Sequence, residues 1–224
     1  MSTTHATVSK EKILNHIVKF ARKHYGSDAG GHDWHHIERV WKMAKRLARD
    51  EQADSFVVQT AALLHDVADW KVSGSLEASG LVSRKLLTKL GVDKSTIDHI
   101  VQIVNNVSFK AAGIPDMMPT LEGKVVQDAD RLDAIGAIAI ARTFAWGGSK
   151  GRSIYIPSEK WTQHTSFRAY ANPHRQGSSI AHFYEKLLLL EKRLHTPTAK
   201  QIAKPRQVFM KEFLRQFFRE WQGK

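Results

Sequence analysis

The chain has 224 residues, of which 42% are hydrophobic, and this length suits one compact domain with a sizeable core. It has no cysteine, which excludes disulfides, thiolate nucleophiles and cysteine-based metal sites, and no apolar run approaches the roughly 20 residues that span a bilayer. Lys and Arg number 34 against 22 acidic residues, and the formal charge of +12 favours anionic partners such as nucleotides, phosphorylated metabolites or nucleic acid.

Apolar residues recur at intervals of three and four almost throughout the chain, which predicts an all-α fold. Asp54 and Asp93 stand where N-caps are expected, and Gly91 is expected to close the helix before Asp93. Strand signals are almost absent. The predicted helical stretches, in chain order, are 13–21, 37–48, 54–68, 76–91 and 93–107, followed by a long apolar segment over about 121–146.

The rest of the chain begins with an interruption of the helical pattern. Residues 147–177 contain glycines, prolines and aromatics, and we interpret them as an irregular lobe or lid. Two helices are expected afterwards, over 178–194 and from Pro197, with Thr196 as the N-cap of the second. We therefore expect a single domain in three parts: a helical core (1–146), the lobe (147–177) and C-terminal helices packed on the core (178–224). The N-terminus has no stretch of signal-peptide type, so we expect a cytoplasmic protein.

Three polar clusters interrupt the apolar faces of three different predicted helices. They are "DWHHIERVW" from Asp33, "LLHDVAD" from Leu63 and "QDADRLDA" from Gln127. Burying such groups unpaired is expensive, but packed helices would let them satisfy one another around a cation. Asp69 follows Asp66 by three positions and lies on the same helical face. Imidazoles and carboxylates together suit Mn²⁺, Fe²⁺, Co²⁺, Ni²⁺ or Zn²⁺ better than Ca²⁺.

"HIERV" at His36, "HD" at His65 and "DADRLDA" around Asp130 together resemble the H…HD…D signature of the HD-domain phosphohydrolase superfamily. The resemblance extends over roughly residues 30 to 220 and is specific, because several separated segments occur in the right order. It points to the small stand-alone bacterial branch and implies a compact HD-domain helical bundle with an additional lobe toward the C-terminus. The segments are "GHDWHHIERVWKMA", "LLHDVADWK", "NVSFK", "VVQDADRLDAIGAIAIAR" and "AHFYEKLL".

The resemblance implies a set of metal ligands and an acid/base. His36 and not His35 matches the first family histidine, because it precedes "RV" by two residues, and "ADRL" matches the distal aspartate. His35, Asp128 and Asp133 remain alternatives to the assigned ligands. Asp69 stands where several family members carry a glutamate that orients or deprotonates the attacking water. The implied metal ligands are His36, His65, Asp66 and Asp130.

Cationic side chains are needed to bind the phosphate groups of a substrate. Lys71 is expected to act beside Asp69 in catalysis. Phosphate contacts are predicted for Arg39, Lys110, Arg131, His182 and Lys186. The aromatic residues Trp70, Phe109, Tyr155 and Trp161 are candidates for stacking on a base.

These residues predict a metal-dependent phosphohydrolase that acts on a phosphorylated small molecule. The enzyme is expected to be a nucleoside triphosphate pyrophosphohydrolase or a phosphatase. The cofactor is a divalent metal ion, with Mn, Mg, Fe, Co, Ni and Zn all open. Two other functions are possible. The first is a nucleic-acid binder or nuclease, which is disfavoured because no nucleic-acid module is recognised. The second is a non-catalytic nucleotide sensor. The apolar run 187–190 is wider than one helical face needs and suggests a homodimer.

Overall fold

The computed structural model describes residues 9–25, 33–68, 77–161, 166–170 and 177–224, and this part of the chain contains helices and no strand. The predicted all-α fold is confirmed. None of the helices in these ranges is both long and apolar enough to cross a membrane. The α-helices are α1 (Lys10–Tyr25), α2 (Trp34–Asp50), α3 (Ser55–Leu64), α5 (Ala78–Lys89), α6 (Lys94–Asn106), α7 (Leu121–Asp133), α8 (Ala137–Ser149), α9 (Phe167–Tyr170), α10 (Ser179–Glu185) and α11 (Pro197–Trp221).

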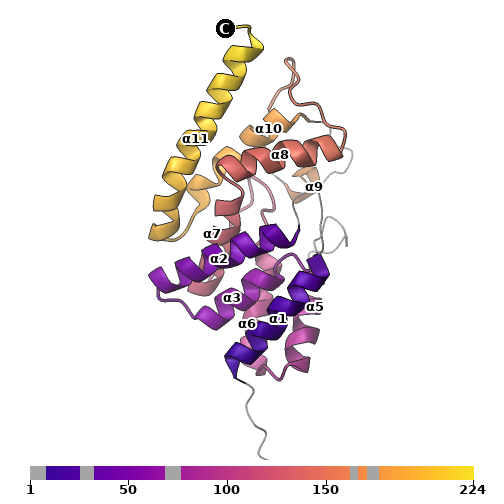
Figure 1. Cartoon of the computed structure of the whole chain (residues 1–224), viewed down its shortest axis with the longest axis vertical. Helices are drawn as coiled ribbons and strands as arrows, with labels where there is room; N and C mark the ends of the chain where they lie inside the picture. Colours follow the sequence, from indigo (N-terminus) through magenta and orange to yellow (C-terminus); the bar gives the residue numbers. More distant parts are fainter. Residues whose placement is uncertain (1–8, 26–32, 69–76, 162–165, 171–176) are drawn as a thin grey trace, which may run out of the picture.

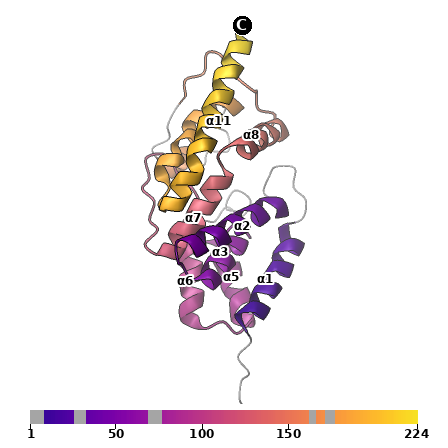
Figure 2. The ribbon, with the colours of Figure 1, turned by 60° about the vertical axis from the view of Figure 1, so that its left-hand side comes forward.

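Helix α7 connects the two halves of the molecule. Helices α1, α2, α3, α5 and α6 form one half, and α8, α10 and α11 form the other (Figures 1 and 2). Helix α7 packs on α2 and α3 in the first half and on α11 in the second. Residues placed on α7 can therefore reach both halves.

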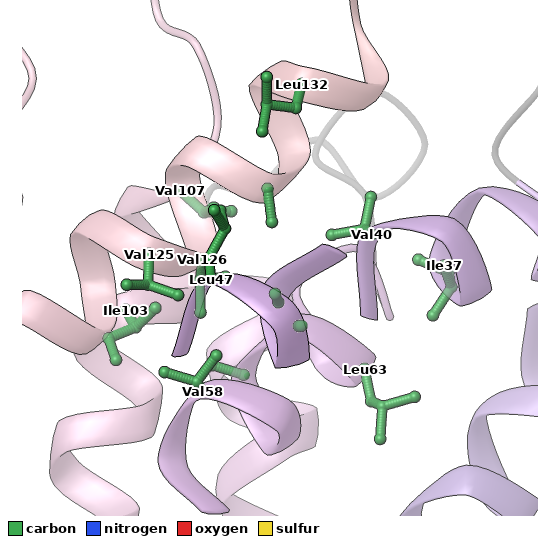
Figure 3. Close-up of a cluster of buried hydrophobic side chains, with 14 of the residues drawn as sticks. Ile37, Val40, Leu47, Val58, Leu63, Ile103, Val107, Val125, Val126 and Leu132 are labelled. Atoms are coloured by element: carbon green, nitrogen blue, oxygen red, sulfur yellow. The ribbon is translucent and has the colours of Figure 1, made fainter. Parts of the chain in front are cut away.

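The core beside α7 includes the apolar faces of three helices, α2, α3 and α7. Figure 3 shows Ile37 and Val40 of α2, Leu63 of α3 and Val126 and Leu132 of α7 gathered in one cluster. All five side chains are completely buried. Replacing one of them with alanine would cost about 2–5 kcal/mol, because a close-packed interior relaxes only partly around a cavity. This packing holds α2, α3 and α7 together next to the polar clusters.

The expected helix ends are largely confirmed. Asp54 and Asp93 accept backbone N–H groups at the starts of α3 and α6, Thr196 caps α11, and Gly91 follows α5 with a φ of 75°. Helix α3 is shorter than predicted, because it ends at Leu64 and the chain turns with Val67 N–H donating to the Leu64 carbonyl.

Two segments predicted as continuous are broken. The apolar segment 121–146 divides into α7 and α8 at Gly136, whose φ is 90° and whose absent Cβ would lie 3.1 Å from Arg206 Cγ. The helix predicted over 178–194 ends at Glu185 and continues as two 3₁₀ turns, Leu187–Leu189 and Glu191–Arg193. A 3₁₀ turn has three residues, so Leu187 and Leu190 both reach the core.

Candidate metal centre

His36 enters the site from the first turn of α2. Asp33 caps this helix and accepts the His36 N–H at 2.9 Å, which fixes where the helix begins. The His36 side chain is 2% exposed, because it lies on the apolar face of α2 with Ile37 and Val40. The first turn of α2 therefore places the His36 imidazole in the protein interior.

His65 and Asp66 follow α3 in the turn that ends it. Every residue of α3 from Phe56 to Leu64 is buried, so this helix is held on all sides. The His65 Nδ1 lies 2.8 Å from the Ala62 carbonyl oxygen, which can only accept a hydrogen bond. Nδ1 must carry the proton, and Nε2 is left as the ring atom with a lone pair for a metal.

Four predicted ligands, His36, His65, Asp66 and Asp130, meet at one point between α2, α3 and α7. The Nε2 atom of His36 lies 3.7 Å from carboxylate oxygens of both Asp66 and Asp130. The Nε2 atom of His65 lies 3.5 Å and 3.8 Å from the same two oxygens. Donor atoms of His36, His65 and Asp66 all lie within 4.8 Å of one another. Side chains from three separate stretches of sequence thus share one small space.

This donor set fits a divalent cation. Imidazole and carboxylate ligands bind such ions at about 2.0–2.2 Å, which places neighbouring ligand atoms roughly 3–3.5 Å apart. The observed separations of 3.5–3.8 Å are within a few tenths of an ångström of this spacing. The His65 Nε2 is buried and makes no hydrogen bond to any described residue, a costly arrangement that a bound metal would relieve. Two imidazoles and two carboxylates suit Mn, Fe, Co, Ni or Zn.

Asp133 orients the His36 ring through Nδ1, the ring nitrogen that faces away from the other predicted ligands. Its Oδ2 accepts the His36 Nδ1–H at 2.8 Å, so Nε2 of this ring also faces the other ligands. Arg39 holds the same carboxylate with two bonds, Nε to Oδ1 at 2.7 Å and Nη2 to Oδ2 at 3.1 Å. Arg142 of α8 adds a bond of 2.6 Å to Oδ2. Asp133, an alternative ligand from sequence, faces the far side of the His36 ring instead of the ligand cluster.

These contacts set the protonation of the pair. Burial acts to raise the pKa of Asp133, but hydrogen bonds from His36 and Arg39 outweigh it and hold this pKa well below its usual range. Burial acts to lower the pKa of His36, but the hydrogen bond to Asp133 and the carboxylate of Asp66, 3.7 Å away, outweigh it and raise this pKa. Asp133 is therefore an anion at neutral pH, positioned to stabilise charge on the His36 ring.

The opposite face of α7 is used for structure. Asp128 is fully buried and accepts the backbone N–H groups of His195 and Thr196, at 2.9 and 2.7 Å, together with the Thr196 hydroxyl at 2.8 Å. Arg131 is 2% exposed and contacts Asp116 at 2.5 Å. Burial raises the pKa of Asp128 and lowers that of Arg131. Asp128 and Arg131 thus hold the segment before α11, and neither lies with the four ligands.

The remaining predicted site residues lie in different parts of the structure. His35 is on the surface of α2, 4.0 Å from Glu38. Lys110 Nζ lies 3.4 Å from the Asn106 side chain. Lys186 Nζ lies 5.4 Å from the centre of the Phe109 ring, and His182 of α10 lies one turn before Lys186, the residue that follows this helix. Asp69, Trp70 and Lys71 lie outside the described residues.

Two predicted base-stacking residues pack against other aromatics. Trp161 stacks on Tyr184 with ring centres 3.8 Å apart, and Tyr155 contacts Trp221 of α11 at 5.0 Å. Phe109 is 6% exposed and has a second cation over its ring, Arg193, at 5.0 Å.

The contacts that Arg142 and Arg193 make could not be predicted from the sequence. Arg193 donates to the carbonyls of Ala111, Ala112 and Ile114, and so holds the loop that follows Phe109 and Lys110. Arg142 ends the quoted segment "VVQDADRLDAIGAIAIAR" but has no predicted role there, and Arg193 belongs to no quoted segment; only folding brings them to their partners. The spacing of Asp130 and Asp133, three residues apart on one helix, is the signal that could have linked Asp133 to the site.

The family model of the HD domain matches residues 33–135, the range that contains all four converging side chains. The chain belongs to the HD domain family. It is 38% identical over 197 residues to YpgQ of Bacillus subtilis, covering 88% of this chain and 87% of that protein.

Solved structures of HD relatives share the fold over nearly the whole chain. A crystal structure from Lactobacillus plantarum superposes with a TM-score of 0.86 at 37% identity, covering 97% of this chain and all of that one. An HD-superfamily hydrolase from Bacillus thuringiensis gives 0.74 at 40% identity, covering 96% and 100%. B. subtilis YpgQ in complex with ADP gives 0.70 at 33% identity, covering 92% and 97%.

Proposed function

We propose that this HD protein is a metal-dependent phosphohydrolase that acts on a nucleotide, as a nucleoside triphosphate pyrophosphohydrolase or a phosphatase. The observation that carries the proposal is the convergence of His36, His65, Asp66 and Asp130, with Nε2 of both rings turned toward the carboxylates. A divalent cation bound there supplies an acidified water and polarises a phosphoryl oxygen. The hydrolase class of the B. thuringiensis relative supports the same reaction type.

The protein's own contribution is to hold the two imidazoles in fixed tautomers. The Ala62 carbonyl fixes His65, and the Asp133 carboxylate fixes His36. Arg39, predicted to contact phosphate, is committed to Asp133, so we assign it a positioning role. Partners of this kind typically contribute about 10–100-fold in metal affinity or activity.

We propose that the substrate is a nucleotide because the relative YpgQ was crystallised with ADP and because two cations, Lys186 and Arg193, lie over the Phe109 ring. Lys110, Lys186 and His182 are the proposed phosphate contacts, and Arg193 positions the loop after Phe109. Arg131 is omitted from this set, since it is buried against Asp116.

Asp69 and Lys71 complete the proposal as the acid/base and an additional phosphate contact. A carboxylate that accepts a proton from the attacking water contributes about 10²–10⁴-fold. Asp69→Asn should therefore lower the rate of hydrolysis by that factor while metal affinity stays within about twofold of wild type.

The test is turnover of nucleoside mono-, di- and triphosphates with Mn²⁺, Mg²⁺, Co²⁺ or Ni²⁺, with a single-stranded oligonucleotide included as a rival substrate. Release of pyrophosphate separates a pyrophosphohydrolase from a phosphatase. Asp66→Ala should abolish turnover, and Asp98→Ala is the matched control, because Asp98 is a surface carboxylate paired with Arg84. Equal turnover by Asp66→Ala and wild type, or cleavage of the oligonucleotide alone, would overturn the proposal.

A further inference from the structure

A groove of about 570 Å³ lies between α2, the junction of α7 and α8, and α11. Four cationic side chains line it: Arg39, Lys42 and Arg46 of α2, and Arg206 of α11. The residues that line it include one carboxylate, Asp133, which already bonds Arg39, Arg142 and His36. The groove therefore has a net positive lining.

The carboxylates that pair with Lys42 and Arg46 do not line the groove. Lys42 pairs with Glu38 at 3.1 Å and Arg46 with Asp50 at 3.7 Å, both along the solvent side of α2. Exposed pairs of this kind are weak and leave the cations able to bind another anion. Within the described residues, Arg206 has no carboxylate partner within 4.0 Å and donates instead to the Leu132 carbonyl.

Arg206 is held in place before any ligand arrives. Its stem packs against Gly136, where even a Cβ would approach Arg206 Cγ to 3.1 Å, and its guanidinium is half-buried on Leu132. Burial lowers the pKa of Arg206; the charge of Asp133 opposes this effect, and the weaker influence of the Arg46 charge adds to it. Arg46 and Arg206 line the same groove, where Asp133 offsets part of their positive charge, and a bound anion would offset the remainder.

The other side of the groove is apolar. Ile138 is 48% exposed and Phe209 is 49% exposed, and both line the groove together with Met43, Ile135 and Pro205. A concave site of this volume that combines exposed large apolar groups with a few fixed polar groups is typical of small-molecule binding. A ligand that matches it has an anionic end and an aromatic or apolar end.

We propose that this groove binds a small organic phosphate that carries an aromatic ring, of which a nucleoside monophosphate is the representative. The phosphate contacts Arg46 and Arg206, and the ring lies on Phe209 and Ile138. Arg39 lines the site but remains bonded to Asp133. This second site shares Arg39 and Asp133 with the hydrogen bonds behind His36, but none of the four proposed metal ligands lines it, and it does not depend on the proposed hydrolysis.

Calorimetric titration of the full chain with AMP in the presence of EDTA tests the proposal, because the chelator removes any metal-dependent phosphate contact. Wild type should show saturable binding. Arg46→Glu and Phe209→Ala should each weaken AMP binding at least about tenfold, as expected for a charge-assisted contact and for a stacking surface. Adenosine and inorganic phosphate should each bind at least about tenfold more weakly than AMP.

Two matched controls locate the binding. Lys45→Glu makes the same charge change on the exposed side of α2, and Val208→Ala removes a neighbouring exposed apolar group, and neither residue lines the groove. Both should bind AMP like wild type. Circular dichroism verifies that all four variants are folded. Absence of saturable binding by wild type, or equal AMP affinity in Arg46→Glu, Phe209→Ala and the two controls, overturns the proposal. Equal affinity for inorganic phosphate and AMP also overturns it, because the groove would then be an anion site alone.

Discussion

The two faces of α7 use similar residues for different purposes. On one face, Asp130 and Asp133 lie toward α2 and serve the His36 ring, one as a proposed metal ligand and the other as its hydrogen-bond acceptor. On the other face, Asp128 and Arg131 bind the chain that leads into α11. Four charged residues within six positions are thus divided between chemistry and architecture by helical periodicity alone.

Replacement of Asp130 should give the largest effect, a loss of hydrolysis with little change in stability. Asp130→Ala removes one of four ligands, so hydrolysis should fall at least about a thousandfold, since metal activation of water and phosphate is worth several kcal/mol. Stability should change little, because the Asp130 side chain is 27% exposed. Steady-state kinetics and a thermal melt measure the two quantities. If Asp130→Ala keeps a tenth of the wild-type activity, the assignment of Asp130 as a metal ligand is wrong.

Replacement of Asp128 should give the reverse result. Asp128→Ala leaves the His195 and Thr196 N–H groups and the Thr196 hydroxyl without their acceptor, and unsatisfied buried donors of this kind should cost about 2–5 kcal/mol in unfolding free energy. Urea denaturation measures this loss. Asp128→Asn keeps one carbonyl acceptor and should lose less. Metal affinity of the folded variant should equal that of wild type, and a selective loss of metal binding would contradict the assignment.

Replacement of Asp133 should have an effect between those of Asp130 and Asp128, a partial loss of metal affinity. Asp133→Asn keeps the shape of the side chain but loses the charge that fixes the His36 ring, so Mn²⁺ affinity should drop about 10–100-fold. Calorimetric titration with Mn²⁺ measures it. The Arg142→Met variant is a useful companion, because it removes a bond to the same carboxylate without touching His36. Its effect on Mn²⁺ affinity should be smaller, and an equal effect would indicate a general loss of packing.

The smallest effect is a pH dependence of stability. The pKa of Asp133 is lower in the folded protein than the unfolded value of 3.8, so its contribution is fully present above about pH 4 and is lost as the pH falls toward the folded value. In metal-free protein, the unfolding free energy should fall below pH 4, and part of this fall, of the order of 1–3 kcal/mol, should be absent from Asp133→Asn. Identical pH profiles for both proteins would contradict the paired state of Asp133.

The sequence predicted the helices best where local capping decides the outcome. Asp54, Asp93 and Thr196 each cap a helix through their own side chains, so the expected helix starts agree with the structure. The breaks at Gly136 and Lys186 were not predicted, because tertiary contacts accompany them. Arg206 packs on Gly136, and Gln207 donates to the Leu188 carbonyl just after the end of α10.

The same contrast applies to the site. The sequence predicted that positions 36, 65, 66 and 130 would come together, and the structure places their donor atoms around one point. It left Asp128 and Asp133 as alternative ligands because helical spacing alone does not say which neighbour each carboxylate meets. Hydrogen bonds from His36 on one side of α7 and from Thr196 on the other settle where each one lies.

The most direct test of the metal centre is the anomalous scattering of crystals grown with Mn²⁺. We expect a single dominant peak per chain, within about 2.0–2.3 Å of Nε2 of His36 and His65 and of carboxylate oxygens of Asp66 and Asp130. A dominant peak elsewhere, or no peak among these four side chains at saturating Mn²⁺, would contradict this expectation.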